Sequence, residues 1–218
     1  MGAPVPAPQL SILRVSKQVY AEAMKAGWEG TRKCFFDLHV FEVIADSEAG
    51  PKSQFNCLGK IELNFTHKMY FQFFGVEDDA SNHTIHLDSS KSKGSYLTRI
   101  PNLTELRIRF RNFEDGWLGF PWTDSYSTDP RDYLSVTCCQ RTMVDWIMTL
   151  AFPFIKSLPK VTLEGYVRKP SKDKWEHILQ MDKDGVAHGF DHGKELSAIL
   201  STPAQYVCQY ARTLFQQY

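Results

Sequence analysis

Two similar segments in the second half of the chain constrain the fold most, because each places an alternating strand just after a proline. The first is "IPNLTELRIRF" at residues 100–110, and the second is "PKVTLEGYV" at residues 159–167. The mostly apolar segment at 142–158 is typical of a helix, which Pro153 should kink or end. A strand, a helix and a strand in this order predict a parallel pair joined by a right-handed crossover.

The two strand segments also share a degenerate leucine-rich pattern. They read Pro-x-Leu-x-x-Leu-x-Ile and Leu-Pro-x-Val-x-Leu. About three repeats are needed before a solenoid buries its core, so two copies do not establish one.

The first half of the chain has the composition of a sheet. Strand-like segments rich in aromatic and β-branched residues occupy residues 34–45, 58–65, 68–76 and 83–87. Thr66 and His67 separate the second segment from the third, and this spacing indicates a hairpin.

Amphipathic helices are expected at both ends of the chain. The first spans Ile12 to Ala26, and its apolar stripe should pack on its own domain. Ser171 is placed to cap a later helix. Further helices are expected at 194–200 and from Pro203 onward. We therefore predict an α/β or α+β fold, in which N-terminal, central and C-terminal helices cover a mixed sheet.

Length and composition favour one intracellular globular domain. The chain has 218 residues and a formal net charge of zero, so nothing attracts it generally to nucleic acid or anionic membrane. The five cysteines are scattered without a CxxC pair, which indicates reduced thiols and a cytoplasmic or nuclear location. We expect a flexible lead-in at 1–9 and a single domain at 10–218, with an alternative subdivision near 95–101. No membrane span, metal site or cofactor is predicted.

The segment "LSILRVSKQVYAEA" at residues 10–23 resembles a phrase found in fungal families of uncharacterised F-box-like proteins. In those families Leu-Arg-Val-x-x-Gln-Ile/Val-Tyr-x-Glu-Ala introduces a helix. The strand at 103–110 resembles their later Ile-x-x-Leu-x-Ile strand. The F-box-like segment that usually comes first is missing here, and "RKCFFDLHV" lacks the usual Asn. The resemblance implies no known activity and no catalytic residues, and at most a protein-interaction role.

A long loop at 112–133 is the strongest candidate for a binding surface. Loops beyond about 12–15 residues are often functional, and aromatic residues dominate binding hot spots. The expected partner-binding residues are Trp117, Phe120, Trp122, Asp115, Asp124 and Tyr126. The alternative is a loop folded onto its own domain, with its tryptophans as local core.

Arg107, Arg109 and Arg111 share one face of the strand at 103–111, because successive strand residues point to opposite faces. Basic residues near aromatic ones can hold phosphates and stack bases, which makes a nucleic-acid or chromatin-associated factor one alternative. The structural alternative is a set of intramolecular ion pairs on an exposed sheet face.

An enzyme with a dispersed site is the other alternative. His188, Asp191 and His192 lie in a loop at 182–193 whose glycines favour a turn over a metal-binding helix. The adjacent cysteines 138 and 139 lack any sequence link to a histidine. We therefore expect a non-enzymatic interaction module, a subunit or adaptor in a larger intracellular fungal complex, with a protein partner.

Overall fold

The computed structural model describes residues 17–46, 53–79, 84–111 and 140–201. Its elements in chain order are α1 (Lys17–Gly30), β1 (Arg32–Phe35), α2 (Leu38–Asp46), the 3-10 turn η3 (Phe55–Cys57), β2 (Lys60–Leu63), α3 (His67–Phe73), β3 (Val76–Asp79), β4 (Thr84–Leu87), α4 (Ser95–Arg99), β5 (Glu105–Phe110), α6 (Gln140–Ile155), β6 (Val161–Gly165), α7 (Lys169–Lys183) and α8 (His192–Ser201). The predicted α/β or α+β fold class is confirmed.

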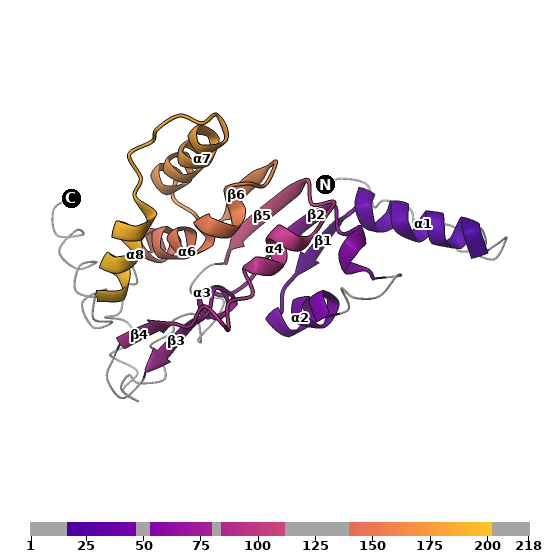
Figure 1. Ribbon diagram of the computed structural model, residues 1–218, viewed down its shortest axis with the longest axis horizontal. Coiled ribbons are helices and arrows are strands. Elements are labelled where there is room, and N and C mark those ends of the chain that lie inside the picture. The colour runs from indigo at the N-terminus through magenta and orange to yellow at the C-terminus, as the bar shows by residue number, and fades with distance from the viewer. Residues whose placement is uncertain (1–16, 47–52, 80–83, 112–139, 202–218) are drawn as a thin grey trace.

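A four-stranded parallel sheet of order β1-β2-β5-β6 forms the centre of the molecule (Figure 1). The strands have the same order in this sheet as in the chain, so each new strand lies beside the sheet strand that was made before it. Leu106 pairs with Val161 and Ile108 pairs with Leu163, so the predicted parallel unit across α6 is confirmed. β3 and β4 form a separate antiparallel pair, inserted between β2 and β5.

One face of the parallel sheet carries the hydrophobic core. Ile61, Leu63, Leu106, Ile108 and Leu163 are almost completely buried. Buried side chains from α2, α3, α6 and α7 belong to the same cluster. Because these strand residues alternate with polar ones, the helices cover the apolar face and leave the charged positions on the other.

The predicted strand at 34–45 is wrong beyond its first residues. β1 ends at Phe35, and Asp37 then accepts a hydrogen bond from the backbone N–H of His39 through Oδ1, at 2.7 Å. This contact caps α2. Phe41 and Ala45, four residues apart, are the buried pair of the helix. The aromatic and β-branched composition favoured a strand, but the spacing of the buried residues is helical.

The predicted hairpin at Thr66 and His67 is also wrong, because these residues start α3. Thr66 Oγ1 accepts a hydrogen bond from the backbone N–H of Met69 at 3.2 Å. His67 is buried together with Tyr70 and Phe71, three and four residues later, and this spacing places them on one helix face. The strand in this region is β3, which begins only at Val76.

The terminal helices differ from expectation in detail. α1 extends from one end of the elongated molecule, opposite α8 (Figure 1). None of the α1 side chains that the structure describes is fully buried, and Trp28 in its last turn packs against the core. Pro153 lies inside α6, which ends two residues later. Ser171 does not cap α7, because that helix begins at Lys169 and buries Ser171.

Candidate functional site

The second face of the parallel sheet is lined by charged and polar side chains. We call it the charged face, and it consists of Arg32, Cys34, Lys60, Glu62, Glu105, Arg107, Arg109, Lys160, Thr162 and Glu164. None of the described core residues occupies these positions. Parallel sheets are usually covered on both faces, so a charged second face is unusual.

Two arginines of β5 organise the charged face through ion pairs to both neighbouring strands. Arg109 Nε lies 2.6 Å from Glu62 Oε1 on β2, and Arg109 Nη2 lies 2.7 Å from Glu164 Oε2 on β6. Arg107 Nη1 lies 3.0 Å from Glu164 Oε1 and its Nε lies 3.4 Å from Glu105 Oε1. These side chains therefore connect three strands across the face.

Further cations surround Glu105 at the amino end of the sheet. Arg32 Nη2 lies 3.0 Å and Lys160 Nζ 3.5 Å from Glu105 Oε1. Burial acts to raise the pKa of Glu105, but these cations outweigh it and hold that pKa below its usual value. The hydrogen bond to Glu62 raises the pKa of Arg109. Both shifts favour the charged forms of Glu105 and Arg109 at neutral pH.

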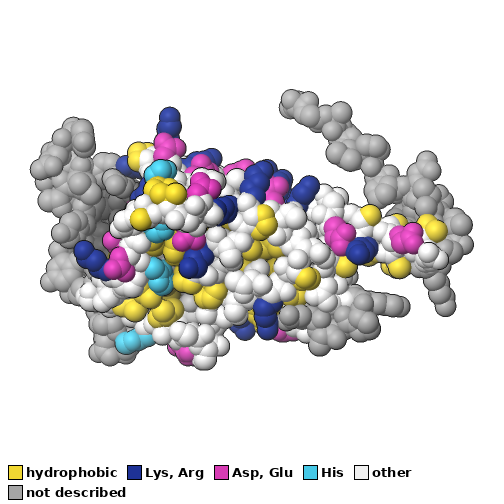
Figure 2. Space-filling view, turned by 45° about the horizontal axis from the view of Figure 1, so that its top comes forward, with side chains coloured by type: hydrophobic (Ala, Val, Ile, Leu, Met, Phe, Trp, Pro, Cys, Tyr) yellow, Lys and Arg dark blue, Asp and Glu magenta, His cyan; other side chains and the backbone are white. Residues whose placement is uncertain are grey.

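The ion pairs affect the alternative prediction that the arginines of β5 bind nucleic acid. Arg107 and Arg109 contact carboxylates, as the structural alternative for them requires. Figure 2 shows basic and acidic side chains intermingled on the face it displays. Such interleaving of signs leaves no continuous basic stripe of the kind that follows a phosphate backbone.

Arg111 differs from the other two arginines because it pairs with neutral acceptors. Its Nε lies 3.0 Å from Asn64 Oδ1, and its Nη2 lies 2.5 Å from the Asn64 carbonyl oxygen and 3.1 Å from that of Phe36. The guanidinium carbon also lies 5.7 Å from the centre of the Phe36 ring. No carboxylate among the described residues forms an ion pair with Arg111.

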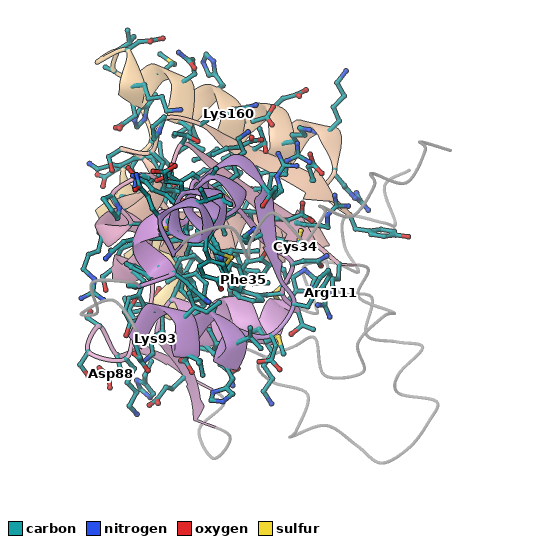
Figure 3. The ribbon with its side chains drawn as sticks, turned by 90° about the vertical axis from the view of Figure 1, so that its right-hand side faces the viewer. Cys34, Phe35, Asp88, Lys93, Arg111 and Lys160 are labelled. Atoms are coloured by element: carbon teal, nitrogen blue, oxygen red, sulfur yellow. The ribbon has the colours of Figure 1, made fainter. Side chains whose placement is uncertain are left out.

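Arg111 belongs to a row at the carboxyl end of the sheet, which we call the carboxyl rim. Phe36, Asn64, Arg111 and Tyr166 each follow a different strand of the sheet. Phe36 and Tyr166 are exposed aromatic residues, with 56% and 59% of their surface accessible. In Figure 3 Arg111 and Cys34 lie on the same side of the molecule. Open α/β sheets commonly build their binding sites at this end.

An apolar strip on α2 continues from the rim. Val40 and Val43 lie three residues apart and share one side of α2, and Phe36 comes two residues before that helix begins. We call them the α2 stripe. All three are exposed, Val40 by 51% and Val43 by 56%. Because Phe36 also contacts Arg111, the stripe places apolar surface next to a cation that pairs with no carboxylate among the described residues.

A buried tyrosine forms hydrogen bonds to the backbone next to the carboxyl rim. The Tyr70 hydroxyl lies 2.6 Å from the carbonyl oxygen of Leu63 and 3.0 Å from that of Arg109. It is therefore placed to donate to either carbonyl, and it ties the ends of β2 and β5 together. Burial raises the pKa of Tyr70 well above its usual value, so the hydroxyl keeps its proton.

Cys34 lies on the edge strand β1, beside Glu62 of β2, and it is the cysteine of the charged face. It is exposed and forms no disulfide. Partial burial of the sulfur and the neighbouring Glu62 carboxylate raise the pKa of the thiol. The thiol is therefore protonated at neutral pH and is a weak nucleophile.

The predicted aromatic loop falls outside the described residues. This holds for Trp117, Phe120, Trp122, Asp115, Asp124 and Tyr126, and also for cysteines 138 and 139. The predicted partner-binding role of the loop stays a prediction. Its neighbour Arg111 is described, and it lies at the carboxyl rim.

The histidine loop makes its contacts with α6 and α7. His188 Nε2 lies 3.6 Å from Asp182 Oδ1, and His192 stacks on Phe152 with ring centres 6.1 Å apart. Asp191 caps α8 by accepting from the backbone N–H of Lys194. Across the described part of the chain, no three metal-ligating side chains come close enough to hold a metal ion.

A hollow of about 300 Å³ lies between α6, α8 and the segment after β4. Its walls are mainly apolar, with Phe74, Leu150 and Phe154 among them. Ser89, Ser92 and His192 supply polar groups, but no acid–base pair with catalytic geometry is present among the described residues that line it.

Sequence reasoning missed most of the candidate site. It identified the three arginines but not Glu62, Glu105 or Glu164, which lie on other strands. The parity of those glutamates within β2, β5 and β6 is a usable signal, since each alternates with buried apolar residues. Phe36 was assigned to a strand interior, so its exposure was not anticipated.

No helix within the described ranges has the length and apolar character that crossing a membrane requires. Compared with models of known protein families, with curated proteins and with solved structures, the chain gave no significant match.

Proposed function

We propose that this protein is a non-enzymatic interaction module, a subunit or adaptor whose protein partner docks on the charged face and the carboxyl rim. The observation that carries the proposal is the asymmetry of the parallel sheet. Its apolar face is closed by helices, whereas its other face is charged and contributes nothing to the described core. A parallel sheet that leaves one face to charged side chains departs from the usual two-sided cover, and a binding role accounts for that departure.

The ion pairs make this surface suitable for recognition. Each guanidinium of Arg107 and Arg109 is held by carboxylates from two positions. Side chains fixed in this way lose little conformational entropy when a partner binds. A surface with both signs of charge also discriminates between partners, because a misplaced like charge is unfavourable.

The absence of assembled chemistry at the same surface agrees with a binding role. Among the described residues, the charged face holds one thiol with a raised pKa and no histidine. The resemblance to fungal F-box-like proteins also implies an interaction role, and this supports the proposal.

Site-specific photo-crosslinking tests the proposal. p-Benzoylphenylalanine in place of Cys34 puts a reactive group on the charged face at an exposed position. The same residue in place of His177, which is exposed on α7, is the matched control on the helical side. Irradiation in cells should give a discrete adduct from position 34 and little or none from position 177.

Two outcomes of the crosslinking experiment would contradict the proposal. Equal adducts from both positions, or adducts from position 177 alone, would move the partner away from the charged face. Circular dichroism of both purified variants checks that the fold is retained.

A further inference from the structure

We infer that the partner segment recognised at the carboxyl rim is acidic and apolar: a carboxylate that pairs with Arg111, followed by aliphatic or aromatic side chains that pack on the α2 stripe. This inference rests on the proposed function and gives the partner its chemistry. It is carried by Arg111 and by the apolar residues beside it.

The charge of the surface favours an acidic partner. Six basic side chains (Arg32, Lys60, Arg107, Arg109, Arg111 and Lys160) and three acidic ones (Glu62, Glu105 and Glu164) belong to the charged face and the rim. Six minus three leaves a net charge of +3 on a chain whose formal net charge is zero. Complementarity of this kind steers the encounter and sets the register of binding.

Arg111 keeps hydrogen-bonding capacity that no described residue uses. Its Nε and Nη2 are taken by three neutral oxygens, which hold the guanidinium in place. Its Nη1 forms no hydrogen bond to any residue in the described part of the chain. A carboxylate placed there gains a charge-assisted hydrogen bond without breaking an existing ion pair.

The α2 stripe supplies the apolar half of the site. Phe36, Val40 and Val43 are exposed by about half their surface, and Phe36 comes just before the helix that carries the two valines. Burying exposed apolar surface is the dominant favourable term in most protein association. Because Phe36 contacts Arg111, a single short segment can reach both the cation and the stripe.

A nucleic acid fits this surface less well. A phosphate backbone needs several free cations in succession. Here Arg107 and Arg109 are paired with carboxylates, so a phosphate would have to compete with Glu62 and Glu164 for them. A carboxylate at Arg111 meets no such competition from the described residues.

The test measures fluorescence anisotropy of defined probes with the full-length protein at 50 and 300 mM salt. The acidic probe is a fluorescein-labelled peptide of three Gly-Glu-Leu-Glu repeats. A peptide of three Gly-Gln-Leu-Gln repeats is its neutral match, and an oligothymidine of 12 nucleotides represents nucleic acid. We expect the acidic peptide to bind at least about tenfold more tightly than the neutral one at 50 mM salt.

Variants locate the site. Arg111→Gln keeps hydrogen-bond donors for the carbonyls but removes the charge, and it should weaken the acidic peptide about tenfold. Arg111→Lys should recover most of that loss. Lys160→Ala removes one charge from the opposite end of the charged face, well away from Arg111 in Figure 3, and should weaken binding less than threefold.

A second matched pair tests the apolar half. Val43→Ser should weaken the peptide several-fold, whereas Val186→Ser, at another exposed valine, should have no effect. Equal effects of Arg111→Gln and Lys160→Ala would overturn the site. Tighter, Arg111-dependent binding of the oligothymidine would replace it with the nucleic-acid alternative. If the acidic peptide does not bind while crosslinking from position 34 persists, the inferred chemistry of the partner is wrong, but the proposed function is retained.

Discussion

His67 makes the stability of this fold depend on pH in a way that can be calculated. Its side chain is only 3% exposed and lies against Phe110, with ring centres 6.3 Å apart. Burial lowers the pKa of His67 from 6.5 to about 4, because the imidazolium ion loses its hydration there. The unfolded chain therefore binds the proton more readily than the folded one between these two values.

The sign and size of the effect follow from this difference. The contribution of His67 is fully present above pH 6.5 and is lost as the pH falls toward about 4. One pKa unit corresponds to about 1.36 kcal/mol, so the free energy of unfolding should fall by about 2 kcal/mol between pH 7.5 and pH 5 from this group alone.

Urea unfolding of the wild type and of His67→Gln at pH 7.5, 6 and 5 isolates this contribution. The variant has no group that titrates here, so the difference between the two free energies of unfolding should change by about 2 kcal/mol across the series. Parallel pH profiles would refute the argument, and so would an NMR titration in which the His67 ring protons shift near pH 6.5.

Two further substitutions test the supports of the carboxyl rim. Tyr70→Phe removes the hydroxyl between the carbonyls of Leu63 and Arg109, and it should lower the free energy of unfolding by about 1–3 kcal/mol in urea titrations, with a loss near zero contradicting the assigned hydrogen bonds. Gly165 has a φ of 79°, and an added Cβ would collide with the carbonyl oxygen of Phe110. Gly165→Ala should therefore lower the thermal midpoint by several degrees, whereas Gly185→Ala, at a φ of 66° in open space, tests the cost of the left-handed backbone alone.

The parallel unit across α6 could be predicted from the sequence because its signals are local and agree with each other. The alternation in β5 and β6 matches the strand period, and the apolar segment between them is too long for a strand. The helices α2 and α3 were missed because composition was weighted above capping and spacing. Asp37 and Thr66 are both N-cap residues, and both had been assigned to strands or turns.

The candidate site shows a different limit. Arg109 pairs with Glu62, which lies 47 residues earlier, and with Glu164, which lies 55 residues later. These contacts depend on the register between strands, and that register is set by helices and turns far from either residue. Residue type and strand parity identified Arg111 as a candidate. Only the arrangement of the strands shows that Arg107 and Arg109 form ion pairs with glutamates, whereas Arg111 bonds to neutral oxygens.

The strand order β1-β2-β5-β6 follows the order of the chain, and it bears on how the protein is made. Each strand can pair with one that the ribosome has already released, so the sheet can grow in the direction of synthesis without waiting for the C-terminal helices. Until β5 and β6 arrive, however, the carboxylate of Glu62 has no guanidinium from β5 beside it. The ion pair between Glu62 and Arg109 therefore cannot form before β5 has been made.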